Sequence, residues 1–354
     1  MKIFLAGGSG TIGVPLVRAL VGAGHQVTAL TRSPDKASML QALGATVAVA
    51  DALDADALRR VVVAAAPTHV IHQLTALPKT GDVRRARDLE PTNRLRIDGT
   101  RNLVAASVEA GAQRIVGGSF APLTAFVGKD VPAGIREGVD AVQSMESQIL
   151  DASRHGSIEG VVLKYGLFYG PGNPATDHMI ALARRRLLPI VRRDRSLLPC
   201  IHLEDAVSAT IAALDHPVAT HHPWPGAVYD VVDDRAVSLT DIIVGIVDRI
   251  DAPRPIAVPA WLLRLVAPYL ARVTSVRLEL SNAKAKAELG WRPRYPTYAD
   301  GLDALLGPGA RRPGPQRAAF APEALRRASP ELDPTASERR QDGFSRANRL
   351  QAHR

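Results

Sequence analysis

The amino-acid sequence predicts an α/β protein built on a doubly wound parallel sheet, and three features carry that prediction. Between residues 2 and 163, short runs rich in β-branched residues alternate with longer segments whose apolar residues lie three and four positions apart. The runs are almost continuously apolar, as strands covered on both faces are. A glycine-rich turn joins the first run to the first helical segment. Alternation of this kind implies right-handed crossovers between parallel strands.

Six runs are predicted as strands, in the order KIFLA, QVTALT, ATVAVA, THVIHQL, RIVGGS and GVVLK. The segments TIGVPLVRALVGAG and TNRLRIDGTRNLVAASVEAG are predicted as helices between them. After Gly170, helical segments such as HLEDAVSATIAALDH are interleaved with short strands such as AVYDVVDD. We therefore predict a first domain over residues 1–170 and a smaller mixed lobe over 171–307, whose elements interleave with the first domain. Residues 308–354, rich in proline, glycine and arginine, are predicted to form a disordered tail.

Composition narrows the classes of function. The chain has 354 residues, 46% of them hydrophobic, which is enough for a sizeable core. The formal charge of +9 includes +5 from residues 308–354, where ten arginines face five acidic residues. Aromatic residues, the usual platforms for stacked bases, make up only 4% of the chain, so nucleic-acid binding is not expected.

Three further observations concern the cellular compartment in which the protein is expected. Cys200 is the single cysteine, so no disulfide within the chain is expected. No apolar run approaches the roughly 20 residues of a membrane span. The first strand-like run begins at Lys2, which leaves no place for a signal peptide. We therefore expect a cytoplasmic protein without a membrane partner.

The segment AGGSGTIG carries a pattern of three glycines, Gly7, Gly10 and Gly13, between the first strand and the first helix. Such glycines permit a tight turn, close approach of the backbone to a pyrophosphate, and close packing of helix on strand. Backbone amides at the helix start, at Thr11 and Ile12, would then meet the phosphates, aided by the helix dipole. No Gly-Lys-Ser/Thr follows, which excludes a Walker-type loop. A dinucleotide site is predicted.

The end of the second strand indicates which dinucleotide binds. A carboxylate there would accept the ribose 2′-hydroxyl of NAD, whereas this sequence has Thr31 and Arg32, with Lys36 a turn later. Arginine can hold two oxygens of a 2′-phosphate at once. NADP is therefore the predicted cofactor, and NAD is the less favoured alternative. Asp51 is expected to meet the adenine edge. Ala52, Leu74 and Thr75, which follow the third and fourth strands, complete the predicted cofactor site; no metal site is expected.

These residues resemble an extended or atypical short-chain dehydrogenase/reductase of the NAD-dependent epimerase/dehydratase family. The resemblance covers residues 1–306 and rests on GGSGTIG, GTRNLVAAS, YGLFYGPG, IHLEDAVSA and SNAKAKAELGWRPRYP. It implies a Rossmann domain for the dinucleotide and a small C-terminal substrate lobe. It also implies a catalytic Tyr-x-x-x-Lys pair on the helix after the fifth strand, assisted by a serine or threonine at the end of that strand.

The chain departs from this family pattern at the catalytic pair. Ser119 matches the catalytic serine or threonine, but the expected helix reads GVDAVQSMESQILDA and holds no tyrosine or lysine. Ser119, Tyr165 and Tyr169 are therefore the catalytic candidates, the serine polarising a carbonyl and either tyrosine acting as a substitute acid. Lys164 is expected in a structural ion pair, and His202 as a hydrogen-bonded, non-catalytic residue.

Two hypotheses about function remain from the sequence. The first is an NADP-dependent oxidoreductase, or an epimerase/dehydratase relative, acting on a small carbonyl or hydroxyl compound. The second is a catalytically silent protein that binds NADP(H) and reports redox state. A nucleotide-sugar substrate is not favoured, because Leu167 and Leu198 occupy the positions where epimerases of the family hold it with Asn and Arg. A homodimer is compatible with the sequence.

Overall fold

The structure is a computed structural model that describes residues 1–78, 85–131, 133–216, 225–266 and 268–308. The described chain belongs to one compact unit over residues 1–310. The predicted disordered tail over 308–354 lies outside the described residues, apart from Pro308. The boundary predicted at residue 170 stays a prediction.

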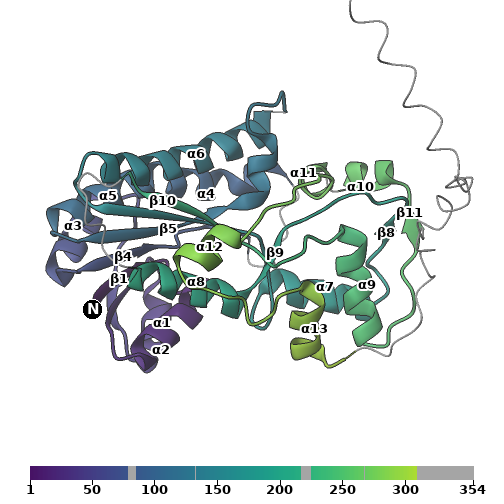
Figure 1. Cartoon of the computed structure of the whole chain (residues 1–354), viewed down its shortest axis with the longest axis horizontal. Helices are drawn as coiled ribbons and strands as arrows, with labels where there is room; N and C mark the ends of the chain where they lie inside the picture. The colour runs from purple at the N-terminus through teal and green to yellow at the C-terminus, as the bar shows by residue number, and fades with distance from the viewer. Residues whose placement is uncertain (79–84, 132, 217–224, 267, 309–354) are drawn as a thin grey trace, which may run out of the picture. The chain divides into compact units, whose positions relative to one another are not determined.

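A seven-stranded parallel sheet forms the centre of this unit, as predicted from the alternating pattern (Figure 1). Its strands follow the spatial order β10-β6-β5-β4-β1-β2-β3, and every neighbouring pair is parallel. The strands are β1 (Lys2–Ala6), β2 (Gln26–Thr31), β3 (Thr46–Val49), β4 (His69–His72), β5 (Arg114–Phe120), β6 (Glu159–Tyr165) and β10 (Ala227–Val231).

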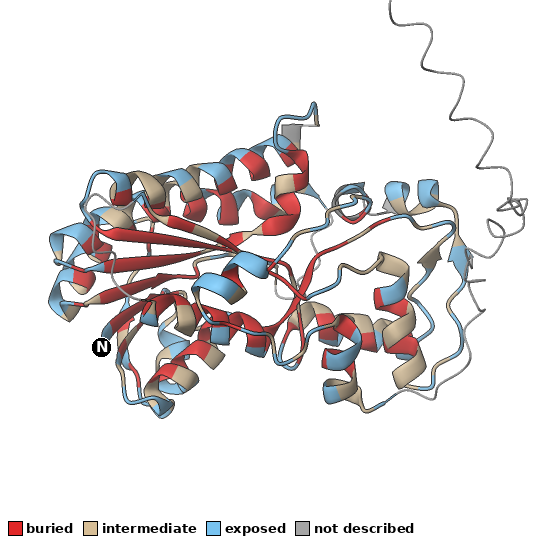
Figure 2. Ribbon diagram, viewed as in Figure 1, coloured by how far each residue is buried: buried red, intermediate tan, exposed pale blue. Residues whose placement is uncertain are grey.

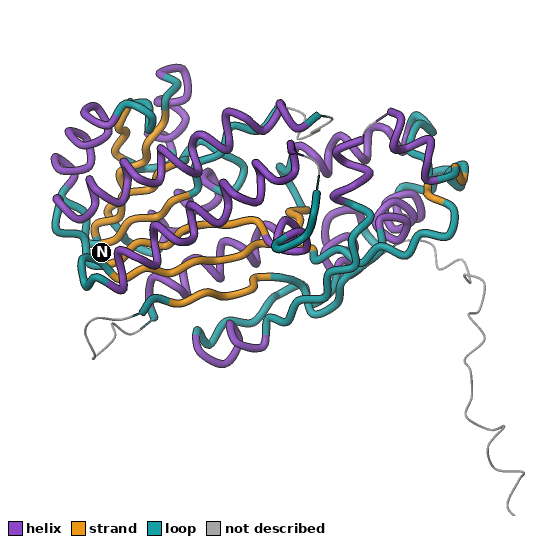
Figure 3. Tube along the Cα trace, turned by 90° about the horizontal axis from the view of Figure 1, so that it is seen from above, coloured by secondary structure: helices purple, strands orange, loops and turns teal. Residues whose placement is uncertain are grey.

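Helices cover both faces of the sheet, so its strands are largely buried (Figure 2). One face packs against α1 (Gly13–Gly22), α2 (Ala37–Ala42) and α8 (Leu203–Asp215). The other packs against α3 (Ala55–Ala65), α5 (Thr100–Glu109) and α6 (Ala133–Arg154). Figure 3 shows the strands running side by side. The doubly wound fold is confirmed.

One helical stretch before β5 departs from regular α geometry. A 3-10 turn, η2 (Ala86–Leu89), leads into α4 (Glu90–Arg94), and a π turn, η3 (Leu95–Gly99), joins α4 to α5. Two more 3-10 turns are η1 (Pro34–Lys36) and η4 (Ala121–Phe126). The last of these follows β5 directly.

The residues after β6 form a smaller set of elements. β7 (Leu167–Tyr169) pairs with β9 (Cys200–His202), and β8 (Ile190–Val191) pairs with β11 (Ala257–Val258). The helices are α7 (Pro174–Arg184), α9 (Leu239–Arg249), α10 (Ala260–Val266), α11 (Pro268–Val273), α12 (Ala283–Glu288) and α13 (Tyr298–Leu306). β10 and α8 come from this part of the chain but pack with the main sheet. No helix in the described part of the chain has the length and apolar character needed to cross a bilayer.

A buried ion pair ties α8 to the sheet. Arg114, at the start of β5, is 1% exposed and contacts Glu159 at the start of β6, with 2.6 Å between Nη2 and Oε2. Its Nη1 also donates to the carbonyl oxygens of Ala213, Leu214 and His216, where α8 ends. A helix C-terminus carries unpaired carbonyls and negative partial charge, so a buried guanidinium satisfies it well.

Two glycines let α6 lie close against the sheet. A Cβ at Gly117 in β5 would come within 2.3 Å of the Ile149 side chain, and one at Gly160 in β6 within 2.4 Å of the Ile149 carbonyl oxygen. Contacts this short are not available to any other residue, so these positions set the distance between helix and strands.

We predict that Gly160→Ala destabilises the fold by about 1–3 kcal/mol, because the added methyl forces α6 away from β6. Denaturant unfolding measures the change. The matched control is Gly22→Ala, since a Cβ at Gly22 meets no atom within 4 Å. Equal stabilities for Gly160→Ala and Gly22→Ala would contradict the proposed close packing.

Candidate active site

The predicted site residues follow one another along the edge where the parallel strands end. Gly7 follows β1, Arg32 follows β2, Ser119 lies near the end of β5 and Lys164 near the end of β6. Ligands of open parallel sheets bind outside the carboxyl ends of the strands. One edge of the sheet therefore carries both the glycine loop and the candidate catalytic residues.

The three glycines of the loop differ in their surroundings and in the reason why a side chain is absent. Gly7 has a φ of +94°, and a Cβ there would lie 2.5 Å from the carbonyl oxygen of Gln73. A Cβ at Gly13 would lie 2.1 Å from the carbonyl oxygen of Gly7. Gly10 is exposed, and a Cβ there would meet only the Gly7 carbonyl oxygen, at 3.2 Å. The fold requires Gly7 and Gly13, whereas at Gly10 the missing side chain leaves space on the outer surface.

The start of α1 is open to an anion. Its N-cap residue, Ile12, makes no side-chain capping hydrogen bond, and the first turn contains no acidic residue. The positive end of the helix dipole therefore meets an exposed loop at Thr11. These features fit the pyrophosphate of a dinucleotide.

The residues predicted to hold the adenosine end lie beside this loop. Thr31 is buried, and its Oγ1 lies 3.1 Å from the hydroxyl of Ser9 in the glycine loop. Arg32 and Lys36 are exposed. Asp51 is exposed after β3, and its Oδ1 accepts the Leu53 amide at 2.9 Å. The remaining predicted residues are Ala52, which is buried, Leu74, which is half-buried, and Thr75, which is exposed.

Ser119, Glu146 and Lys164 form a polar network beside α6, the helix that lacks the tyrosine and lysine pair of the family. Ser119 is 5% exposed, and its hydroxyl donates to Oε1 of Glu146 on α6 at 2.5 Å. Lys164 Nζ lies 3.1 Å from the other carboxylate oxygen, Oε2. The Glu146 and Lys164 side chains are 14% and 21% exposed, so this ion pair is only partly open to water. The ion pair expected for Lys164 is therefore present, with Glu146 as its partner.

The fold explains how these three residues meet. In the parallel register of β5 on β6, Ser119 lies opposite Lys164. Successive side chains on a strand alternate between the two faces, so Ser119 points to the same face as Gly117, against which α6 packs. Glu146 precedes Ile149 by about one helical turn, which brings its carboxylate to the ends of the two strands.

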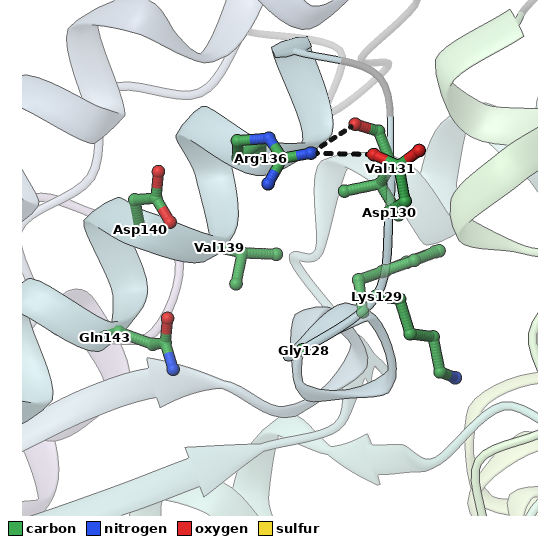
Figure 4. Close-up of a pocket in the computed structure, with 9 residues that line it drawn as sticks. Gly128, Lys129, Asp130, Val131, Arg136, Val139, Asp140 and Gln143 are labelled. Carbon is green, nitrogen blue, oxygen red and sulfur yellow. Dashed lines mark hydrogen bonds and ion pairs between the residues drawn. The ribbon is translucent and has the colours of Figure 1, made fainter.

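Two adjoining cavities open beside this network. The inner one, of about 270 Å³, is lined by Leu123, Thr124, Val127, Val139, Val142, Gln143, Glu146 and Lys164. The outer one, of about 350 Å³, shares Val139 and Gln143 with it and includes Lys129, Asp130, Arg136 and Asp140 (Figure 4). At its rim, Arg136 donates to Asp130 at 2.9 Å. Glu146 and Lys164 thus form a polar end to a mainly apolar cavity.

Tyr165 lies on the opposite side of β6 from Lys164, in the core that packs against α1 and α8. Its hydroxyl accepts from Nε2 of Gln73 at 3.1 Å and lies 2.7 Å from Oγ1 of Thr210, which donates to the Ala206 carbonyl. Because Thr210 uses its only hydroxyl proton in the hydrogen bond to Ala206, the Tyr165 hydroxyl is the donor in its contact with Thr210. Burial raises the pKa of Tyr165 to about 12. Its role as an acid stays a prediction that these contacts do not support.

Tyr169 lies in a second core, formed by α7, α9 and α13. Its hydroxyl contacts Oδ2 of Asp233 at 3.0 Å and the Thr297 carbonyl at 3.2 Å. Asp233 is 3% exposed, and burial raises its pKa to about 8 although the hydrogen bond from Tyr169 acts in the opposite direction. Burial also raises the pKa of Tyr169. The contacts made by Tyr169 tie β7 to the segments around Asp233 and Thr297, and its catalytic role stays a prediction.

His202 caps α8, as its expected non-catalytic role requires. The residue is 1% exposed, and its Nδ1 accepts the Glu204 amide at 3.3 Å. Burial lowers the pKa of His202, so the ring is neutral near pH 7.

Sequence reasoning missed two residues of the site. Glu146 is not singled out in the sequence analysis, although its spacing from Val142 and Ile149 places it on the buried face. His72, at the end of β4, is fully buried; its Nδ1 accepts the Leu74 amide at 3.2 Å and its Nε2 contacts Thr100 Oγ1 at 2.7 Å. Burial and the Arg96 charge lower the pKa of His72 to about 4, so it is a neutral residue that holds the start of the β4 loop.

The sheet topology and glycine loop define a Rossmann-type dinucleotide-binding protein. The sequence profile of the NAD dependent epimerase/dehydratase family matches residues 3–230, and the chain belongs to that family. The family is one of NAD-dependent epimerases and dehydratases, its relatives include reductases, and this chain is an enzyme of the same class.

Relatives of known activity include several reductases. The chain is 34% identical to the 3-diazoavenalumate denitrifying reductase of a Streptomyces species, over 85% of this chain and 99% of that protein. It is 27% identical to a 4-hydroxy-2-methyl-3-oxo-4-farnesyl-3,4-dihydroquinoline-1-oxide ketoreductase of Stigmatella aurantiaca, over 90% of this chain and 100% of that protein. The structure of a UDP-glucose 4-epimerase from Thermotoga maritima superposes with a TM-score of 0.68 at 18% identity, covering 86% of this chain and 97% of the epimerase, a likeness of fold.

We predict that Gly10→Ala weakens NADPH binding at least about tenfold while leaving the unfolding midpoint nearly unchanged, because its methyl would occupy the exposed surface of the loop. Gly13→Ala, in contrast, should destabilise the fold itself. Calorimetric titration with NADPH, together with thermal unfolding of both variants, separates the two effects. Unaltered NADPH affinity in Gly10→Ala would remove this loop surface from the cofactor site.

We also predict a pH-dependent effect of Asp233→Asn. The folded-state pKa is raised to about 8 from 3.8, so the contribution of this carboxyl to stability is present below pH 3.8 and is lost as the pH rises through 8. An amide does not titrate, so the unfolding free energy of the variant relative to the natural protein should increase from about pH 5 to about pH 8. Denaturant unfolding at both pH values measures this difference; a constant difference would contradict the raised pKa.

Proposed function

We propose that the protein is an NADP-dependent oxidoreductase that interconverts a small carbonyl compound and the corresponding alcohol. The observation that carries the proposal is the arrangement on one sheet edge of the glycine loop, Arg32 and the network of Ser119, Glu146 and Lys164. The reductases among the relatives support the same type of reaction. A bound nicotinamide supplies or accepts the hydride in such a reaction.

NADP is proposed over NAD because of the residues at the end of β2. Arg32 and Lys36 are both exposed there, where their charges are available to a 2′-phosphate. Thr31, the last residue of β2, is uncharged, so no carboxylate at that position repels the phosphate. The adenosine end would lie between these side chains and Asp51.

Ser119 is proposed to position the Glu146 carboxylate at the reacting oxygen. Its hydroxyl is fixed by Glu146, which lines the inner cavity, and the apolar walls of that cavity would exclude water around the reacting carbon. Tyr165 and Tyr169 remain alternative acids, but each hydroxyl already contacts buried acceptors. The proposal therefore does not rest on either tyrosine.

A nucleotide sugar is not proposed as the substrate. Leu198, at a position where epimerases of the family hold such a substrate, is fully buried in the core around α9, and Leu167 packs against the same core. The alternative of a catalytically silent redox sensor has no support among the relatives, several of whose names describe reductases.

We predict that Ser119→Ala lowers NADPH-dependent turnover at least about tenfold with unchanged cofactor affinity, since it removes the hydrogen bond that positions the Glu146 carboxylate. A panel of aromatic and aliphatic ketones, followed by NADPH absorbance, provides the assay. Ser147→Ala, on the same helix as Glu146 and exposed, is the control. Unchanged turnover would remove Ser119 from the mechanism, and absence of turnover with every ketone would refute the proposed reaction.

We predict that Arg32→Ala weakens NADPH binding more than NADH binding, by about 1–3 kcal/mol for the lost charged hydrogen bond. Calorimetric titration with each dinucleotide measures the difference. Arg60→Ala, an exposed arginine on α3, is the control. Equal weakening of NADPH and NADH binding would refute the assignment of NADP.

A further inference from the structure

The inner cavity combines an apolar body with one charged end. Leu123 and Val127 come from the turn after β5, and Val139 and Val142 come from α6. The charged end consists of Glu146 and Lys164. A volume of about 270 Å³ corresponds to roughly nine water molecules, which suits one ring or a short branched chain.

The Glu146 carboxylate has acceptor capacity to spare. Two carboxylate oxygens offer about four acceptor positions, of which Ser119 uses one on Oε1 and Lys164 pairs with Oε2. Lys164 in turn has three donor positions and gives one to this ion pair. Both side chains line the cavity, so a ligand there meets an acceptor and a donor about 3 Å apart.

A hydroxyl group matches this pair better than the other common polar groups. It can donate to Glu146 and accept from Lys164 at once, whereas a ketone oxygen can only accept. A carboxylate would be repelled by Glu146, and an ammonium group by Lys164. The apolar walls would surround the carbon skeleton on which the hydroxyl stands.

We infer that this cavity binds a one-ring or short-chain apolar alcohol through Glu146 and Lys164, and that Glu146 takes up the hydroxyl proton. The inference rests on the proposed function, whose substrate class it specifies. In the oxidation, the O–H bond breaks with its proton passing to the Glu146 carboxylate. The C–H bond breaks with its electron pair leaving as hydride to the oxidised nicotinamide dinucleotide, and the carbon–oxygen double bond forms. In the reduction, Glu146 returns the proton to the carbonyl oxygen. Ser119 acts as a positioning residue for the carboxylate, and Lys164 contacts both the carboxylate and the alcohol oxygen.

The outer cavity provides the way in. It adjoins the inner cavity through Val139 and Gln143 and is bordered by Lys129, Arg136 and Asp130 (Figure 4). The polar rim would face water while the skeleton of the alcohol passes between the apolar side chains of α6 and the turn after β5.

The test is a binding measurement that does not require turnover. 1-Phenylethanol and acetophenone share one carbon skeleton and differ in the hydroxyl and the ketone. We expect the full chain without added cofactor, in ligand-observed NMR titrations, to bind the alcohol at least about tenfold more tightly, as a hydrogen bond to a charged group provides. Glu146→Gln should abolish this preference, because an amide both donates and accepts.

Two further variants keep the outcome unambiguous. Glu137→Gln, an exposed glutamate on the same helix, should retain the preference. Val127→Trp should weaken both probes at least about tenfold by filling the cavity, and the 45% exposure of Val127 leaves room for the larger ring without disturbing the core. Thermal unfolding establishes that each variant is folded.

Equal binding of the two probes, binding of neither, or a preference that survives in Glu146→Gln would overturn the inference. A different result would refute the proposed function alone. The protein would still prefer the alcohol, and this preference would depend on Glu146, but NADPH would reduce no ketone. If the Glu146→Gln variant reduced ketones as fast as the natural protein, only the proton-transfer role of Glu146 would be refuted.

Discussion

The register of β5 on β6 is the constraint on which the candidate site depends. It sets Ser119 opposite Lys164 at the edge where ligands of a parallel sheet bind. Gly117 and Gly160 then allow α6 to approach the two strands closely, and Glu146 comes between the hydroxyl and the ammonium group. A slip of one residue in this register would turn one of the two side chains to the other face of the sheet.

The amino ends of β5 and β6 are joined by a buried ion pair. At their amino ends, Arg114 and Glu159 form a nearly water-free ion pair that also satisfies the end of α8. Such a pair adds little net stability on its own, but removing one partner leaves a buried charge. The pair fixes β5 beside β6 and anchors a helix from the later part of the chain. It thereby contributes to holding the register from which the site is built.

Much of this arrangement was predictable from sequence, because periodicity and glycine spacing report local backbone requirements. The strands from KIFLA to GVVLK and the glycine loop follow from such local patterns, and Ser119 follows from the resemblance to the family. The surroundings of Ser119 could not be predicted in this way, because its neighbours are far from it in sequence. Lys164 lies opposite Ser119 through the register of β5 on β6, and Glu146 meets both through the packing of α6 on the sheet. Tyr165 illustrates the converse: its place near the end of β6 suggested chemistry, but strand alternation turns it into the core against Thr210.

In the proposed reaction, hydride and proton move between a dinucleotide and an apolar alcohol or ketone at the carboxyl edge of the sheet. The most direct test is isotopic: NADPH carrying deuterium at the transferable position is incubated with the protein and a ketone, and the product is examined by mass spectrometry. The account predicts one deuterium on the carbon that bears the new hydroxyl, with a single stereochemistry at that carbon. Tight binding of NADPH without transfer of deuterium to any of the ketones would contradict the proposed reaction.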